Sequence, residues 1–184
     1  MRNIKKEEIW SIPNCMGYFR ILLIPIFCII YLNAESMKDY YLAAGVVLVS
    51  TITDLFDGKV ARKFNMVTEL GKFVDPFADK LTHAAVALCL CSRYKRMIWL
   101  VSLMAVKEGF MAVMGLINLR RGKKLDGAKW YGKICTATLF VILGVLVLIP
   151  EISLKIADGL ILGEMAVMTV VLVLYAFEFR KMAK

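Results

Sequence analysis

Residues 54–62 read Asp-Leu-Phe-Asp-Gly-Lys-Val-Ala-Arg, and eight residues later positions 71–79 read Gly-Lys-Phe-Val-Asp-Pro-Phe-Ala-Asp. These strings place four carboxylates, those of Asp54, Asp57, Asp75 and Asp79, in apolar stretches long enough to lie in a membrane. An aspartate at the bilayer centre costs roughly 2.5–3.5 kcal/mol on insertion scales, so four of them require a polar cavity, cationic partners or a metal. Asp54 and Asp57 are three residues apart and Asp75 and Asp79 four apart, so each pair shares one helical face. The strings therefore predict two helices that direct four carboxylates to one point.

The residue types of this pattern suit a divalent metal acting on a phosphate. Hard carboxylate oxygens favour Mg²⁺, Ca²⁺ or Mn²⁺, and Mg²⁺ is usually bound by carboxylates together with substrate phosphates. Gly58 and Gly71 lack side chains and would let a phosphate or a base approach the backbone. Ala61 keeps the same face open, and Arg62 offers a planar fork for phosphate oxygens.

The full pattern resembles the signature of the CDP-alcohol phosphotransferase family of integral membrane enzymes, also called the CDP-alcohol phosphatidyltransferases of class I. The matching positions are Asp54, Asp57, Gly58, Ala61, Arg62, Gly71, Asp75 and Asp79. Weaker matches at Ile12-Pro13-Asn14, Arg20, Lys107-Glu108 and Gly132-Lys133 are similar to elements of the bacterial phosphatidylglycerolphosphate synthases within this family.

The resemblance implies a specific chemistry. It assigns Asp54, Asp57, Asp75 and Asp79 as ligands of two divalent ions, Mg²⁺ or Mn²⁺, that hold the pyrophosphate of a CDP-linked donor. Asp54, Asp57, Gly58, Ala61, Arg62, Gly71 and Asp75 would form the site for that donor. Asp79 would also be the catalytic base that takes the proton of the acceptor hydroxyl, with CMP leaving. Most catalysis in phosphoryl transfer is positioning and charge neutralisation, which metals supply. A homodimer is a further implication of the resemblance.

The composition independently indicates an all-α integral membrane protein. Sixty per cent of the 184 residues are apolar and the mean hydropathy is +0.68. Apolar runs of about the 20 residues needed to cross hydrocarbon predict six transmembrane helices near residues 17–33, 40–57, 73–91, 96–118, 133–150 and 156–178. Lipid-exposed backbone must be helical, so no sheet is expected. The chain is too short for an added soluble domain, and we expect one membrane domain over residues 1–184.

The distribution of basic residues predicts the orientation. With the N-terminus inside, sixteen Lys and Arg residues fall on the cytoplasmic side and five on the other side, while Arg20, Lys80 and Lys107 are embedded. This bias predicts a protein of the cytoplasmic membrane with both termini and the active-site mouth facing the cytoplasm. Residues 1–16 are expected to form an interfacial segment, with a short helix whose Ile4, Ile9 and Trp10 reach the acyl boundary.

The net charge of +9 is scattered over short loops. Nucleic-acid binding would need a basic face on a soluble domain, so anionic membrane lipids are the expected partners. A concentration of basic side chains toward the cytoplasmic mouth predicts an acceptor that carries its own phosphate. The residues assigned to that phosphate are Lys107, Arg120, Lys124, Lys129 and Lys133.

Together with these basic residues, the resemblance to the phosphatidylglycerolphosphate synthases implies transfer of the phosphatidyl group from CDP-diacylglycerol to sn-glycerol 3-phosphate, giving phosphatidylglycerolphosphate and CMP. Two departures from the resembled synthases leave other acceptors open, namely Lys107 in place of a usual arginine and Cys135 in place of a common lysine. The alternatives are a cardiolipin synthase that uses phosphatidylglycerol and a phosphatidylinositol-phosphate synthase. A divalent-cation transporter is the non-enzymatic alternative, since membrane carboxylates on paired helices can pass cations. Glu164, in the last apolar run, has no evident partner in the sequence.

Overall fold

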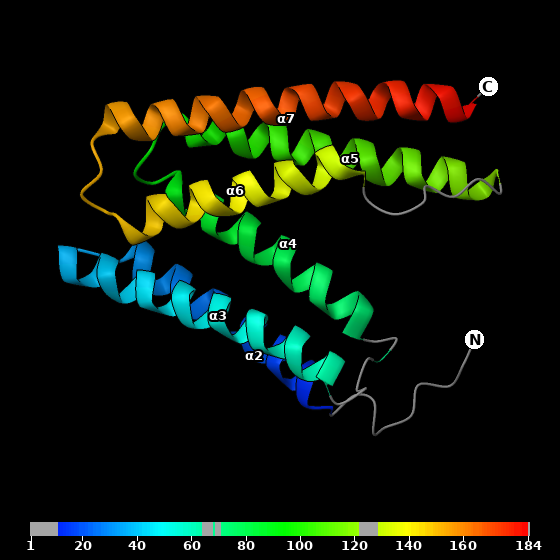
Figure 1. Ribbon diagram of the computed structural model, residues 1–184. Helices are drawn as coiled ribbons and strands as arrows, with labels where there is room; N and C mark the ends of the chain where they lie inside the picture. Colours follow the sequence, from blue (N-terminus) through cyan, green and yellow to red (C-terminus); the bar gives the residue numbers. More distant parts are fainter. Residues whose placement is uncertain (1–10, 64–67, 69–70, 122–128, 184) are drawn as a thin grey trace. The chain divides into compact units, whose positions relative to one another are not determined.

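The computed structural model describes the backbone of residues 11–63, 68, 71–121 and 129–183, with the side chains of all of these except 57, 58, 60–63, 72, 73, 182 and 183. Over these residues the secondary structure consists of helices, without strands (Figure 1). The helices are α2 (Ile12–Leu32), α3 (Met37–Lys63), α4 (Gly71–Leu90), α5 (Met97–Arg120), α6 (Trp130–Leu148) and α7 (Leu154–Ala183). Each of the six predicted apolar runs coincides with one of them, which confirms the all-α prediction.

Five of these helices are long and apolar enough to cross a membrane: α2, the Met37–Phe56 part of α3, α5, α6 and α7. The protein is therefore a multi-pass membrane protein. The 20-residue α4 is long enough but is not among the five, because Asp75, Asp79 and Lys80 fall within every 18-residue stretch of it. Two of these three charged residues, Asp75 and Asp79, belong to the predicted site.

Helix α2 begins five residues before the apolar run predicted at residues 17–33. It starts at Ile12, after Ser11 in an extended conformation, and the expected interfacial position of residues 1–16 stays a prediction. Pro13 stands in the first helical turn, where its fixed φ favours helix initiation and its missing N–H costs nothing. Residues 1–10, with the predicted interfacial contacts of Ile4, Ile9 and Trp10, lie outside the described residues.

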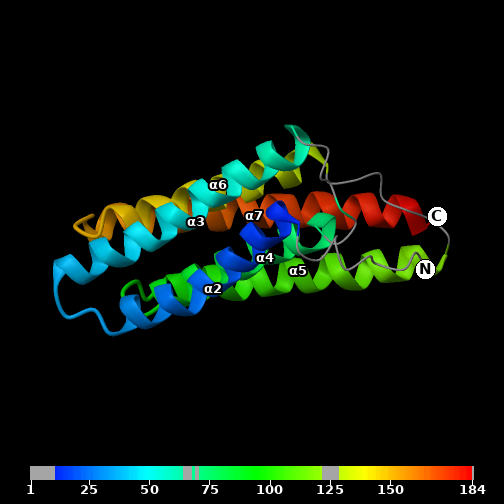
Figure 2. The ribbon, with the colours of Figure 1, turned by 90° about the horizontal axis from the view of Figure 1, so that it is seen from below.

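The chain divides into two compact units, residues 1–89 and residues 90–184. In the first unit α2 packs along α3, as Figures 1 and 2 show. Gly17 permits a close approach of α2 to α4, because a Cβ added there would lie 3.2 Å from Cγ1 of Val74 and 3.6 Å from Oδ1 of Asp75. A small residue at this point brings the backbone of α2 against the face of α4 that carries the carboxylates.

In the second unit α7 packs against both α5 and α6. Gly132 of α6 is covered by the ring of Tyr175 from α7, and an added Cβ would lie 3.1 Å from Cζ of that ring. Phe110 of α5 and Phe179 of α7 meet edge to face with ring centroids 5.8 Å apart. Such aromatic contacts have a preferred geometry, so they help to fix the register of α7 on its two neighbours.

Candidate active site

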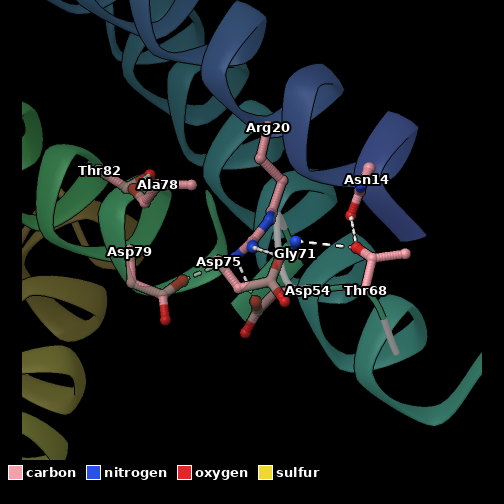
Figure 3. A network of polar contacts seen from close by, with 9 residues as sticks. All are labelled: Asn14, Arg20, Asp54, Thr68, Gly71, Asp75, Ala78, Asp79 and Thr82. Atoms are coloured by element: carbon pink, nitrogen blue, oxygen red, sulfur yellow. Dashed lines mark hydrogen bonds and ion pairs between the residues drawn. The ribbon is translucent and has the colours of Figure 1, made fainter. Parts of the chain in front are cut away.

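Arg20 of α2 lies at the centre of the predicted carboxylate cluster (Figure 3). Its Nη1 donates to Oδ1 of Asp54 in α3 and, at 2.7 Å, to Oδ1 of Asp79 in α4. Its Nη2 lies 3.9 Å from Oδ1 of Asp75. One guanidinium thus joins three helices through three carboxylates, and the prediction that Asp54, Asp75 and Asp79 converge is confirmed for the described side chains.

The cluster is buried on the arginine side and open on the other. The side chain of Arg20 is 3% exposed, whereas those of Asp54, Asp75 and Asp79 are 41%, 44% and 47% exposed. Oδ1 of Asp75 is itself buried and accepts no hydrogen bond from the described residues. The exposed parts of the three carboxylates therefore face a ligand that approaches from the open side.

The remaining motif positions on α3 lie beyond Asp54 in the same continuous helix, which runs to Lys63. The helical register puts positions 54, 57, 58, 61 and 62 along one face, as the spacing predicts. The side chains of Asp57, Ala61 and Arg62 are outside the description, so their predicted roles stay predictions.

The start of α4 is fixed by a chain of three residues. The backbone N–H of Gly71 donates to Oγ1 of Thr68 at 2.9 Å, and that hydroxyl donates to Oδ1 of Asn14 at 3.1 Å. The bond from Thr68 to the amide three residues later satisfies one of the free N–H groups of a helix start. A Cβ on Gly71 would lie 2.7 Å from Oδ1 of Asn14, which is 1% exposed. Packing against Asn14 therefore requires a glycine at position 71, in addition to the predicted place of Gly71 in the donor site.

An apolar crevice adjoins the cluster in the same unit. It is lined by residues of α2, α3 and α4, namely Leu23, Ile24, Phe27, Val46, Val47, Ser50, Thr82, Ala85 and Val86. Ser50 is one helical turn before Asp54, and Thr82 is about one turn after Asp79. Apolar surface thus begins one turn away from the carboxylates along the same helices.

The residues predicted to bind the acceptor phosphate belong to the second unit, and four of the five are described. Lys107 of α5 is buried, and its Nζ lies 3.1 Å from Oε1 of Glu108. Lys129, at the start of α6, lies 3.1 Å from Oε1 of Glu178 in α7. Both cations are therefore paired within their own unit.

Arg120 at the end of α5 and Lys133 in the first turns of α6 are exposed, and neither has an ion pair within the described part of the chain. Their charges are available to an anionic ligand. Lys124 lies outside the described residues.

A buried polar cluster in the second unit surrounds Glu164 of α7, which is 0% exposed. Its Oε1 accepts a long contact from Sγ of Cys135 at 3.9 Å, and its Oε2 has no hydrogen-bond partner among the described residues. Lys107 lies near enough to act electrostatically on both groups. Cys135, the departure noted in the sequence, therefore packs against a buried carboxyl group.

The donor set of the first unit fits a hard divalent ion. The half-exposed carboxylates of Asp54, Asp75 and Asp79 supply only oxygen, and Asp75 keeps a buried oxygen atom that accepts no hydrogen bond. Among the described side chains these residues do not form a preassembled metal site, and Arg20 contacts all three of them. Asp57, the fourth predicted ligand, lies one helical turn from Asp54 on α3.

These features describe a multi-pass membrane protein with a cluster of carboxylates around one buried arginine, and comparison with known proteins gives its family. A model of the CDP-alcohol phosphatidyltransferase family matches residues 10–177. The chain is 30% identical over 164 residues to the CDP-diacylglycerol–glycerol-3-phosphate 3-phosphatidyltransferase of Escherichia coli, an alignment that covers 87% of this chain and 89% of that protein. A Shigella sonnei protein of the same name gives the same identity and coverage.

It is also 29% identical over 168 residues to a Mycobacterium tuberculosis protein named "Probable phosphatidylglycerophosphate synthase", covering 90% of this chain and 79% of that protein. The chain belongs to the CDP-alcohol phosphatidyltransferase family. The family resemblance stated from the motif is confirmed, and the cation-transporter alternative is left without support.

Three residues of these sites were not assigned by the sequence interpretation. Arg20 and Asn14 were noted only as weak matches, yet the first joins the carboxylates and the second fixes the start of α4. Glu164 was noted without a role. Arg20 and Glu164 could have been found from the same sequence signal. Each is a charged residue within an apolar run, and such a residue requires a partner inside the protein.

Proposed function

We propose that this protein transfers the phosphatidyl group of CDP-diacylglycerol to sn-glycerol 3-phosphate, giving phosphatidylglycerolphosphate and CMP. The observation that carries the proposal is the convergence of Asp54, Asp75 and Asp79 on one open site, in a chain that belongs to the CDP-alcohol phosphatidyltransferase family. The names of the Escherichia coli and Mycobacterium tuberculosis relatives support this choice of reaction.

The reaction needs one bond made and one broken at the phosphorus atom that bears the lipid. The acceptor hydroxyl oxygen attacks that phosphorus, the bond to the CMP oxygen breaks, and the hydroxyl proton goes to Asp79. Asp79 suits this role because its carboxylate is half exposed and is held at one oxygen by Arg20, which leaves the second oxygen to take the proton. Asp79 is therefore the proposed catalytic base.

Asp54, Asp57, Asp75 and Asp79 are the proposed ligands for two divalent ions, Mg²⁺ or Mn²⁺. When bound, such ions neutralise the charge of the donor pyrophosphate and of the leaving CMP. The proposal rests on the all-oxygen donor set, on the open side of the three described carboxylates and on the helical register that puts position 57 beside position 54. Gly58, Ala61, Arg62 and Gly71 complete the proposed donor site.

The donor is a lipid, and two features suit a lipid substrate. The carboxylates lie in helices of a membrane protein, and the apolar crevice begins one helical turn from Asp54 and Asp79. The lipid donor has the same order of polar and apolar parts. Its charged phosphates would lie at the carboxylates and its apolar chains would lie beyond them.

Lys107, Arg120, Lys124, Lys129 and Lys133 are proposed to bind the phosphate of the acceptor. Among them Lys133 is the strongest candidate, because it is exposed near the start of α6 and has no ion pair within the described residues. A charge-assisted hydrogen bond from one such lysine is worth roughly 1.5–3 kcal/mol.

We further propose that the protein works in the cytoplasmic membrane with both termini and the active-site mouth toward the cytoplasm, as a homodimer among anionic lipids. The excess of basic residues in the segments assigned to the inside supports this orientation.

The proposed reaction is tested with purified protein, CDP-diacylglycerol and Mg²⁺ or Mn²⁺. Glycerol 3-phosphate, inositol phosphate, inositol, serine and phosphatidylglycerol are supplied in parallel, and both CMP and the lipid product are measured. We expect phosphatidylglycerolphosphate with glycerol 3-phosphate only. Product with phosphatidylglycerol alone would make the protein a cardiolipin synthase of the same family, and product with inositol phosphate alone would make it a phosphatidylinositol-phosphate synthase.

A further inference from the structure

Arg20 is a permanent cation placed among groups that a divalent metal would need. Its guanidinium stays protonated in proteins, and its side chain is 3% exposed, so it cannot exchange its partners for bulk water. Nη1 donates to Asp54 and Asp79, and Nη2 faces Asp75 (Figure 3). One positive charge is thereby shared by three carboxylates from two helices.

This arrangement has an electrostatic consequence. Carboxylates held in one site repel one another, and an opposite charge within about 4–6 Å relieves the repulsion. Among the described side chains Arg20 offsets one of three negative charges, so the cluster still attracts a divalent ion. A divalent ion that binds the same carboxylates competes with Arg20, because two cations at one cluster repel each other.

We propose that Arg20 is a built-in counter-cation that competes with the divalent metal for Asp54 and Asp79 and thereby sets the metal affinity of the site. The inference rests on the proposed metal-dependent function. Arg20 holds α2, α3 and α4 together through the carboxylates and gives them up in part as the metal binds. It is a positioning residue and acts on the reaction through the carboxylates that it contacts.

The proposal predicts opposite effects of one substitution on metal affinity and on stability. Arg20→Gln removes the charge, so purified protein in detergent should bind Mn²⁺ at least ~10-fold more tightly than the wild type by titration calorimetry. Solvent at the half-exposed carboxylates screens part of the repulsion, which keeps the expected change near this lower bound. In EDTA the same variant should unfold at a lower temperature than the wild type. Saturating Mn²⁺ should reduce this difference in unfolding temperature.

Two control variants separate the charge from other effects. Arg20→Lys keeps the positive charge and should bind Mn²⁺ within about threefold of the wild type if charge sets the affinity. Arg96→Gln removes an arginine whose Nε lies 3.1 Å from Oδ2 of Asp158 in the second unit, and it should leave the Mn²⁺ affinity unchanged.

A second measurement uses the wild type, so that the test does not depend on the folding of Arg20→Gln. The Nε–H signal of Arg20, assigned by its loss in Arg20→Lys, should shift during a Mg²⁺ titration with a midpoint at the Mg²⁺ dissociation constant. The inference would be overturned if Arg20→Gln bound Mn²⁺ no more tightly than the wild type does. It would also be overturned if the Nε–H signal of Arg20 did not shift when Mg²⁺ is added. Wild-type protein that binds neither ion would instead overturn the proposed metal-dependent function.

Discussion

Replacing Asp79 by asparagine tests whether this residue is the catalytic base. The substitution keeps the shape of the side chain and removes its ability to take a proton. General acid–base catalysis contributes typically ~10²–10⁴-fold, so Asp79→Asn should lower kcat by at least ~10²-fold. The binding of CDP-diacylglycerol should change far less.

The structure supplies a matched control in Asp54. Asp54 and Asp79 both accept from Nη1 of Arg20, and their side chains are 41% and 47% exposed. Each asparagine variant therefore loses one ion pair of the same kind, worth on the order of 1 kcal/mol at this exposure. Because the structural cost is matched, a difference between the two variants reports their different roles. Asp54→Asn should weaken metal and donor binding.

The measurement combines CMP release at saturating glycerol 3-phosphate with calorimetric binding of CDP-diacylglycerol in micelles. A loss of transition-state stabilisation alone lowers kcat and leaves the donor dissociation constant near that of the wild type. The reasoning is refuted if Asp79→Asn loses donor affinity as severely as Asp54→Asn, which would make Asp79 chiefly a metal ligand. A fall in kcat of less than about tenfold would refute it as well.

Four other outcomes are expected. EDTA should abolish CMP release and added Mg²⁺ or Mn²⁺ should restore it, and full activity in metal-free buffer would remove the two-metal proposal. Lys133→Ala should raise the KM for glycerol 3-phosphate ~10- to 100-fold with little effect on the donor, whereas Lys155→Ala, an exposed lysine at the other end of its unit's helices, should not. Gly132→Ala should destabilise the protein by about 1–3 kcal/mol, read as a lower unfolding temperature, because its Cβ overlaps Tyr175. Glu164→Leu should have a free energy of unfolding that is higher than that of the wild type or lower by no more than about 1 kcal/mol, because one oxygen of the Glu164 carboxyl group has no hydrogen-bond partner among the described residues. A decrease of ~3 kcal/mol would instead identify Glu164 as the partner of a buried cation.

The helices were predictable from the sequence because the bilayer imposes one length and one composition on a spanning segment. The ends were less predictable, since polar residues can be buried inside a helix near its start. Asn14 illustrates this, because it lies in α2 ahead of the apolar run at 17–33 and is 1% exposed. It accepts a hydrogen bond from Thr68, which is 54 residues away in the chain and beyond the reach of any local pattern.

The carboxylate site was predictable in its residues and not in its contacts. Spacings of three and four residues determine which side chains share a helical face. They do not determine which cation the faces meet, and Arg20 reaches Asp54 across 34 residues and Asp79 across 59. The spacing of the acceptor residues was less informative still, because Lys107 and Lys129 were assigned to a phosphate and have carboxylate partners in the structure.

In the first unit, the residues of the proposed site also attach the helix that carries it. Every 18-residue stretch of α4 contains Asp75, Asp79 and Lys80, and such charged groups in a membrane protein need polar partners. Its attachments are polar: Thr68 ties its start to Asn14, and Arg20 ties its carboxylates to α2 and α3. Gly17 keeps α2 close enough for these bonds to form. A ligand that displaces Arg20 from the carboxylates must therefore supply new contacts that hold the helices together. Divalent ions and a pyrophosphate together would supply them.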